Sequence, residues 1–182
     1  MPKGAQLYNF RIDLSDIDNN NYGLITYKSV LHPSETLERM VLRSILYAVF
    51  NYQQLEFTKG VCVADEPDLW SQNEDGKTGM WLEIGLPTNE RLHKICRDSN
   101  QVVLILYGKA YNRYKCQKSI GNNHDNNLSL IYINDQFVTS VAANAIKNNH
   151  WSIIIQDNEI TVIDGDDTFT TSLKALDRVS TS

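Results

Sequence analysis

One unbroken apolar run in the middle of the chain limits the fold more than any other feature. Between Gln101 and Tyr107 every residue is aliphatic, namely Val102, Val103, Leu104, Ile105 and Leu106. Such runs are typical of a strand buried on both faces, which is the place of a central, parallel strand in an α/β protein. The chain has 182 residues, 42% of them hydrophobic and 21% charged. That composition predicts one globular domain with enough apolar side chains to bury the strand.

Alternating polar and apolar residues predict further strands on either side of this run. Residues 6–13 and 22–31 alternate and are joined by a cluster of turn residues, which predicts an N-terminal hairpin. Residues 151–156 and 159–163 flank Asp157-Asn158, which predicts a second hairpin near the C-terminus. Residues 79–85 predict another strand, in which Trp81 and Glu83 share one face.

Helical spacing of apolar residues predicts helices between these strands. The longest is expected to begin at His32-Pro33-Ser34-Glu35, because proline and an acid suit the first turn, and to end near Phe50. A second is expected to follow Thr88 as its cap. The remaining expected elements are helices over 108–118 and 135–147, strands over 55–63 and 128–133, and a helical turn over 68–73.

This order predicts a mixed α/β fold with one central mixed sheet flanked by helices, an N-terminal hairpin and extra C-terminal strands. Residues 1–182 are expected to form a single domain with a frayed tail after about residue 177. Three scattered cysteines, Cys62, Cys96 and Cys116, are expected to be single buried thiols rather than a disulfide framework or a zinc site.

Charge and hydropathy limit the partners and the location. A formal net charge of −5 argues against loose, charge-driven nucleic-acid binding, although a local basic groove remains compatible with it. No apolar run approaches the roughly 20 residues of a membrane span. No apolar segment follows the N-terminus as in a signal peptide, so a cytoplasmic protein without membrane contact is expected.

Two carboxylates are the first candidates for chemistry. Asp65 follows one predicted strand and Glu83 lies near the end of the next. Adjacent strands can bring both to one end of a sheet, where two carboxylates and waters suit Mg²⁺ or Mn²⁺. The alternative is that Asp65 caps a turn and Glu83 is solvated.

Further candidates lie on the predicted helices. Glu38 borders the apolar stripe of the long helix and could complete a metal shell, or it could pair on the surface with Arg39 or Arg43. Arg91, Lys94 and Arg97 form a set of cations, one of which could orient a metal-bound water, or the set could be a solvated helix face.

The segment from Tyr107 to Lys118 interleaves aromatic and basic side chains. It could stack bases and contact phosphates, or form an amphipathic helix whose tyrosines pack inward.

Several segments together resemble the YaeQ family. They cover most of the chain in order. The segments are His32-Pro33-Ser34-Glu35-Thr36 with Glu38-Arg39-Met40, Phe57-Thr58-Lys59-Gly60, Asp65-Glu66-Pro67 with Leu69-Trp70, Trp81-Leu82-Glu83-Ile84-Gly85-Leu86-Pro87 with Arg91 and Lys94, and Asn127-Leu128-Ser129. The family resembles a variant of the PD-(D/E)xK nuclease superfamily. That resemblance implies a metal site in which Glu83 is the acid of the second motif, Asp65 that of the first, and Glu38 the helical acid. Asp68 is the aspartate of the Pro-Asp pair and is the alternative to Asp65.

The chain departs from that superfamily at one position. Gly85 stands where the motif has lysine, and Lys94 is the expected substitute. Two functions follow from the resemblance. One is a Mg²⁺- or Mn²⁺-dependent phosphodiesterase acting on nucleic acid, with Asp65, Glu83 and Lys94 as catalytic residues and Glu38 as a further metal ligand. The other is a non-catalytic protein on a degenerate nuclease scaffold that binds nucleic acid or another protein.

Overall fold

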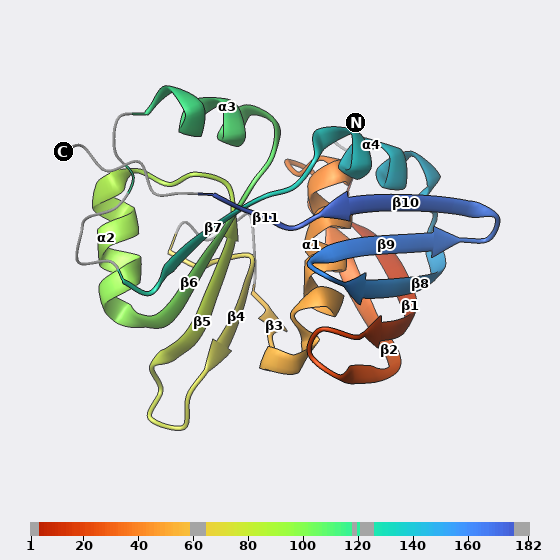
Figure 1. Cartoon of the computed structure of the whole chain (residues 1–182), viewed down its shortest axis with the longest axis horizontal. Helices are drawn as coiled ribbons and strands as arrows, with labels where there is room; N and C mark the ends of the chain where they lie inside the picture. Colours follow the sequence, from red (N-terminus) through yellow and green to blue (C-terminus); the bar gives the residue numbers. More distant parts are fainter. Residues whose placement is uncertain (1–3, 59–64, 118–119, 121–125, 177–182) are drawn as a thin grey trace. The chain divides into compact units, whose positions relative to one another are not determined.

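The structure is a computed structural model that describes residues 4–58, 65–117, 120 and 126–176. Within these residues it has the predicted mixed α/β composition, with four α-helices. The strands form a five-stranded and a six-stranded sheet instead of the one central sheet expected from the sequence (Figure 1). The chain divides accordingly into two compact units, Met1–Tyr52 with Asn134–Leu173 (unit 1) and Gln53–Ile133 with Lys174–Ser182 (unit 2).

Unit 1 contains the five-stranded sheet and two helices. Its elements are β1 (Gln6–Asp16), β2 (Asn21–Leu31), α1 (Leu37–Val49), α4 (Asp135–Asn144), β8 (Asn148–Gln156), β9 (Glu159–Asp164) and β10 (Asp167–Ser172). The strand order is β10-β9-β8-β1-β2, in which β1 and β8 are parallel and the other neighbours are antiparallel. Both predicted hairpins are confirmed, and Asp157 and Asn158 have the positive φ angles of a tight hairpin turn.

The core of unit 1 lies on one face of this sheet. Along β1, Phe10, Ile12 and Leu14 are buried while the residues between them point outward. Trp151 of β8 contacts Phe10 edge to face at a centroid distance of 5.2 Å. Helix α1 contacts β1, β2 and α4, so the apolar stripe of α1 is buried in this core.

The first helix starts later than the sequence predicts. Thr36 caps α1 by accepting a hydrogen bond from the backbone N–H of Arg39. Glu35 therefore precedes the helix, where its buried carboxylate forms ion pairs with Arg43 at 3.0 Å and Arg39 at 3.3 Å. The extended backbone and the cap at Thr36 mark the start of the helix, so Glu35 lies outside the first turn.

Unit 2 contains the six-stranded sheet. Its elements are β3 (Glu56–Phe57), β4 (Leu69–Gln72), β5 (Thr78–Ile84), α2 (Asn89–Asp98), β6 (Ser99–Leu106), α3 (Gly108–Cys116), β7 (Leu128–Tyr132) and β11 (Lys174–Leu176), and a 3₁₀ turn at Asn51–Gln53 precedes them. The strand order is β11-β7-β6-β5-β4-β3, in which β5, β6 and β7 are parallel. The apolar run is β6, central, parallel and buried on both faces as predicted.

One face of this sheet packs against α2 and α3. Trp81, Leu104 and Leu130 on the strands form one buried cluster with Leu92 and Ile95 of α2. Helix α2 has the predicted Thr88 cap, since the Thr88 hydroxyl accepts from the N–H of Arg91 at 3.3 Å. The N-terminal end of α2 is thereby fixed beside the end of β5.

Two further local predictions are wrong, and a third is confirmed only in part. Residues 69–72 form β4 rather than a helical turn, because they pair with β5 in an antiparallel ladder. The strand expected over 55–63 is limited to β3 within the described residues, and residues 59–64 lie outside them. Cys96 is buried as expected but Cys116 is exposed at the end of the amphipathic α3, and Cys62 lies outside the described residues.

Candidate functional site

The end of the β4–β5 ladder holds a buried carboxylate. Asp68 immediately precedes β4, and its backbone N–H donates to the carbonyl of Leu82 at 3.1 Å. Its Oδ2 accepts from the backbone N–H of Ile84 at 2.7 Å, and the residue is only 2% exposed. The carboxylate thus takes the place of a strand carbonyl as acceptor, which fixes it at the C-terminal end of β5.

Glu83 lies next to this position on β5. It shares a face with Trp81, which packs in the core cluster beside α2. Glu83 Oε2 accepts from Trp81 Nε1 at 3.0 Å and from Arg91 Nη2 at 3.1 Å. The Arg91 guanidinium also lies 5.8 Å from the centroid of the Trp81 ring. These contacts link β5, which carries Trp81 and Glu83, to Arg91 in the first turn of α2.

The loop between β5 and α2 explains how Arg91 reaches Glu83. Gly85 has φ +137°, a backbone conformation that residues with a side chain rarely adopt. Its N–H donates to the carbonyl of Ile105, so the loop stays attached to β6. Arg113 of α3 donates to the carbonyl of Leu86 at 2.8 Å. The loop is short and fixed at both ends, so α2 begins directly beside Glu83.

Lys94 lies one turn further along α2. It is exposed, and it forms no hydrogen bond or ion pair with another residue in the described part of the chain. The pKa of Asp98 is lowered chiefly by its hydrogen bond from Arg97, and the charge of Lys94 contributes to the same shift. The cation paired with Glu83 is accordingly Arg91, whereas Lys94 belongs to the solvated side of the helix.

Asp65 and Asp68 differ sharply in environment. Asp65 is exposed in a turn directly after residues that the structure leaves undescribed, while Pro67 and Asp68 are buried. Asp68, but not Asp65, has a hydrogen bond to β5 in the structure. The geometry therefore favours Asp68 as the acid beside Glu83, the alternative that the Pro67-Asp68 dipeptide offered in the sequence.

Glu38 belongs to the other unit. It lies half-buried in the first turn of α1, and its neighbours Arg39 and Arg43 pair with Glu35 instead of with Glu38. Among residues 4–58, 65–117, 120 and 126–176, no three His, Cys, Asp or Glu side chains gather closely enough to hold a metal ion. In unit 2, Asp68 and Glu83 both lie at the C-terminal end of β5.

The aromatic and basic segment on α3 packs mainly against its own unit. Tyr111 lies against Tyr132 of β7 at a centroid distance of 4.0 Å and stacks on Tyr114 at 6.0 Å. Both α3 tyrosines pack on the core cluster, and Lys115 Nζ lies 4.8 Å from the Tyr111 ring centroid. The amphipathic-helix interpretation therefore accounts for these tyrosines, and Lys118 lies outside the described residues.

The sequence pattern did not predict the ion pair between Arg91 and Glu83 or the hydrogen bond from Trp81 to Glu83. The signal was present, because residues two apart on a strand share a face and Arg91 falls in the first turn after the Thr88 cap. What the pattern lacked was the close packing of α2 on that face. The choice between Arg91 and Lys94 depends on this packing and not on the spacing of the basic residues.

The sequence model described as YaeQ protein matches residues 1–173. The chain belongs to the YaeQ family. It is 30% identical over 183 aligned positions to the uncharacterized protein YaeQ of Escherichia coli (strain K12), with 97% of this chain and 98% of the relative covered. It is 29% identical to its Salmonella typhi counterpart, with 88% and 89% covered.

Crystal structures of YaeQ proteins have the same fold. The YaeQ protein of Xanthomonas axonopodis pv. citri superposes with a TM-score of 0.85 at 28% identity, covering 94% of this chain and 97% of that one. The Pseudomonas syringae protein gives 0.82 at 26% identity, covering 95% and 96%. In the described residues, no helix of this YaeQ chain has the length and apolarity to cross a membrane.

Proposed function

We propose that this YaeQ chain is a metal-dependent phosphodiesterase of the PD-(D/E)xK type that acts on nucleic acid in the cytoplasm. The observation that supports it is the pairing of β4 with β5, which holds the Asp68 carboxylate on the backbone of Ile84, next to Glu83. The resemblance implies an aspartate and the glutamate of a second motif as metal ligands, and Asp68 and Glu83 would be this pair. Mg²⁺ or Mn²⁺ bound there would activate water and stabilise the phosphoryl transition state.

Each side chain has an expected role in this proposal. Asp68 and Glu83 of unit 2 bind the cation, with Asp65 as the exposed alternative to Asp68, whereas Glu38 belongs to unit 1 and is not assigned to this site. Gly85 occupies the lysine position of the motif with φ +137°, so the required cation must come from α2. Arg91 is the first candidate because it already bonds to Glu83, and Lys94 is the second.

Cleavage assays test this proposal. The purified chain is incubated with DNA and RNA panels in Mg²⁺ or Mn²⁺, and the variants are Asp68→Asn, Asp65→Asn, Glu83→Gln, Arg91→Gln and Lys94→Gln. Loss of a metal ligand is expected to lower the cleavage rate by about a hundredfold or more. Glu90→Gln, an exposed acid on the same helix, is the matched control and should cleave normally. Cleavage that survives EDTA, or that is equal in wild type and the Asp68→Asn/Glu83→Gln double variant, would contradict the proposal.

A second candidate is a non-catalytic binding protein on the same scaffold. It is favoured by one observation, that Glu83 Oε2 is already engaged by Trp81 and Arg91. Isothermal titration calorimetry with Mg²⁺ and Mn²⁺ separates the two functions. Specific binding that is lost in Glu83→Gln supports the enzyme, whereas nucleic-acid binding without metal binding supports the scaffold.

A further inference from the structure

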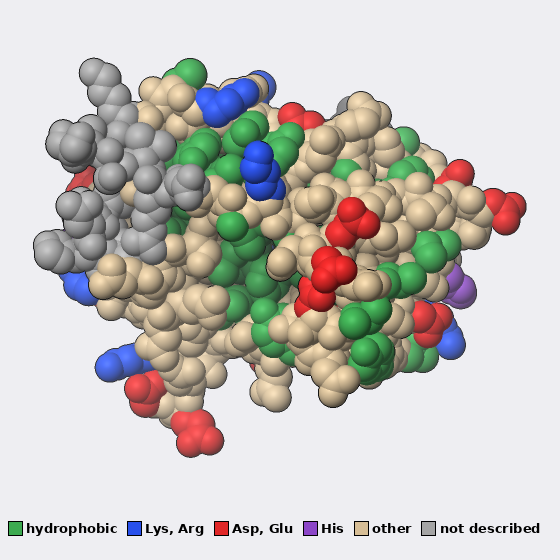
Figure 2. Space-filling view, in the orientation of Figure 1, with side chains coloured by type: hydrophobic (Ala, Val, Ile, Leu, Met, Phe, Trp, Pro, Cys, Tyr) green, Lys and Arg blue, Asp and Glu red, His purple; other side chains and the backbone are tan. Residues whose placement is uncertain are grey.

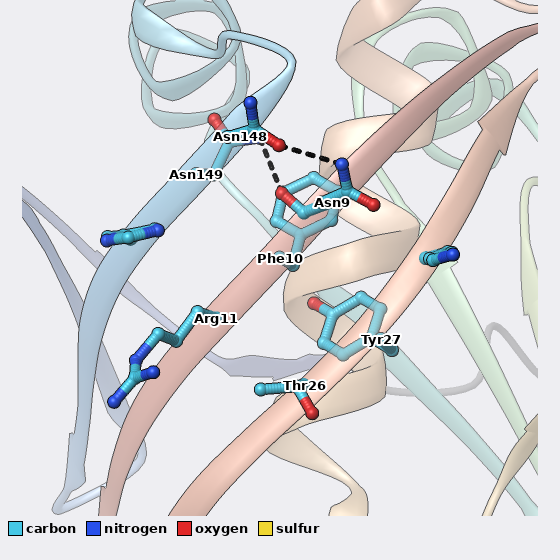
Figure 3. A pocket seen from close by; sticks show the side chains of 9 residues that line it. Asn9, Phe10, Arg11, Thr26, Tyr27, Asn148 and Asn149 are labelled. Carbon is cyan, nitrogen blue, oxygen red and sulfur yellow. Dashed lines mark hydrogen bonds between the residues drawn. The ribbon is translucent and has the colours of Figure 1, made fainter.

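A pocket in unit 1 is lined by basic and amide side chains on the outer face of the sheet and by the aromatic side chains of Phe10 and Tyr27. The pocket has a volume of about 480 Å³ and lies across β1, β2 and β8 (Figure 3). Its lining includes Arg11 of β1, Lys28 of β2 and His150 of β8, with the amides of Asn9 and Asn148 beside them. A volume of this size suits one small ligand.

The strand register brings these side chains together. Asn9 of β1 pairs with Lys28 on one side and with Asn148 on the other, and Arg11 pairs with Thr26 and His150 in the same way. Residues paired across neighbouring strands lie about 5 Å apart on the same face of a sheet. This is the face opposite Phe10 and Trp151, so all six side chains point away from the core.

The basic groups in the pocket are not neutralised by the protein. Arg11, Lys28 and His150 are exposed, and none forms a hydrogen bond or an ion pair with another described residue. None of the described residues that line the pocket is Asp or Glu, and the nearest acid along the outward side of β1 is Asp13. By contrast, Arg39 and Arg43 in the same unit both pair with Glu35.

The amides of the pocket are held in place by hydrogen bonds. Asn9 Nδ2 donates to Asn148 Oδ1 at 2.7 Å. The Asn149 amide donates to the carbonyls of Asn9 and Ile146 and accepts from the N–H of Ile146, which fixes the start of β8. Two cations, an imidazole and fixed amides therefore surround one volume in a protein of net charge −5. Arg11 and Lys28 are diagonal neighbours on adjacent strands, so one anionic ligand could contact both cations.

Charge complementarity points to a phosphate group. We propose that this pocket binds the phosphate of a nucleotide, either free or within a single nucleic-acid strand. The Arg11 fork and the Lys28 ammonium match phosphate oxygens, and the amides and imidazole supply further donors. The proposal does not rest on the metal site, because it concerns unit 1 residues and requires no divalent cation.

Binding in EDTA tests the proposal separately from any cleavage. The full chain is titrated against a short fluorescein-labelled single-stranded oligonucleotide, and anisotropy gives the Kd. The double variant Arg11→Gln/Lys28→Gln is expected to raise the Kd by about tenfold or more, because two charge-assisted contacts are lost. Each lost phosphate contact to a single strand should lower the slope of log K against log salt by roughly 0.7, so the double variant should lower it by about 1.4. Lys77→Gln/Lys174→Gln removes the same charge at exposed positions of unit 2 and should leave the Kd within about twofold.

Backbone amide shifts in NMR spectra show where the ligand lies and which source of phosphate it prefers. Inorganic phosphate, a nucleoside monophosphate and the oligonucleotide are compared, and shifts in β1, β2 and β8 are expected. Shifts with the monophosphate show that one phosphate suffices, and shifts with the oligonucleotide alone show that several are needed; both support the pocket. His150→Gln, a milder variant, should weaken binding without loss of fold. An unchanged Kd in the Arg11→Gln/Lys28→Gln variant, or shifts confined to unit 2, would overturn the proposal.

Discussion

Asp68 shows how one residue can serve structure and chemistry at once. A buried carboxylate is costly unless its oxygens accept hydrogen bonds, and the backbone N–H of Ile84 provides one at 2.7 Å. That bond also provides an acceptor for the Ile84 N–H at the end of β5, where the neighbouring strand offers no carbonyl. The same rigidity that stabilises the strand end holds the carboxylate at a fixed place beside Glu83.

Asp68→Ala is expected to lower the free energy of unfolding by about 1–3 kcal/mol, because the buried N–H of Ile84 loses its acceptor. Asp68→Asn keeps an acceptor oxygen and should lose much less. Urea denaturation measures both, and Asp65→Ala should change stability by no more than about 0.5 kcal/mol because Asp65 is exposed. Equal losses for Asp68→Ala and Asp65→Ala would show that the hydrogen bond to Ile84 contributes nothing.

Tyr27 gives the stability of unit 1 a dependence on alkaline pH. Burial raises the pKa of the Tyr27 phenol well above its usual value of 10.0, Tyr47 adds to this, and the hydrogen bond to Ser44 opposes it. The folded state therefore prefers the protonated phenol. This contribution is complete below pH 10 and is lost as the pH rises from 10 towards the folded-state pKa.

Tyr27→Phe removes this titration and the 2.7 Å hydrogen bond to the Ser44 carbonyl. The wild type is expected to be more stable than the variant by about 1 kcal/mol at neutral pH, and the difference should shrink above pH 10. Urea denaturation at a series of pH values measures it. A difference that grows with pH would contradict the raised pKa.

At the scale of elements, the β4–β5 ladder depends on a close approach near its turn. A Cβ atom added to Gly79 would lie 2.8 Å from Asn73 Oδ1 and 2.9 Å from Ser71 Oγ. The Ser71 hydroxyl accepts from the N–H of Met80 at 3.0 Å, and the register shifts between Ser71 and Gln72. A Cβ at this position would displace both side chains, so glycine is favoured where the bulge brings them onto β5.

Gly79→Ala is expected to destabilise the chain by about 1–3 kcal/mol, since it displaces the Ser71 hydroxyl from Met80. Gly23→Ala on β2 has no atom within 4 Å and should be neutral or slightly stabilising. Thermal unfolding compares the two variants. If both have the same midpoint, the close approach at Gly79 is not limiting.

At the scale of the molecule, the chain passes through two cores. It leaves unit 1 after Tyr52, forms most of unit 2, returns at Asn134 to add β8, β9 and β10, and ends with β11 in the sheet of unit 2. The parallel pairing of β1 with β8 joins segments almost 140 residues apart, as in the contact between Asn9 and Asn148.

On the face drawn in Figure 2, described basic side chains are dispersed among acidic ones without a broad basic patch.

Because each unit has its own core, truncating a core side chain in one unit should raise hydrogen exchange mainly in that unit. Leu104→Ala in unit 2 and Ile153→Ala in unit 1 remove fully buried side chains, and each should cost about 2–5 kcal/mol. Hydrogen exchange should rise most in β5, β6 and β7 for the first variant and in β1 and β8 for the second. Equal increases in both units from either variant would show that the cores unfold as one.

Local pattern by itself determined most elements of this chain. The period of two along β1 and β5, the unbroken run of β6 and the Thr88 cap are short-range features, so their strands and helix appear as predicted. Glu83 as a candidate followed from the family resemblance and its position on a strand. The sequence predicts a helical turn over 68–73, whereas residues 69–72 form a strand, because that strand depends on pairing with β5, which no local pattern contains.

Only the tertiary structure decided how these elements are distributed and which side chains meet. The division into two sheets depends on pairings such as β1 with β8 and β7 with β11, which are set by packing between distant segments. Asp68 rather than Asp65 accepts a hydrogen bond from β5, and Arg91 rather than Lys94 donates to Glu83, and both bonds form only when β4, β5 and α2 are assembled. The pocket of unit 1 also depends on tertiary structure, because His150 is far from Arg11 in the sequence and lies beside it only through the parallel pairing of β1 with β8.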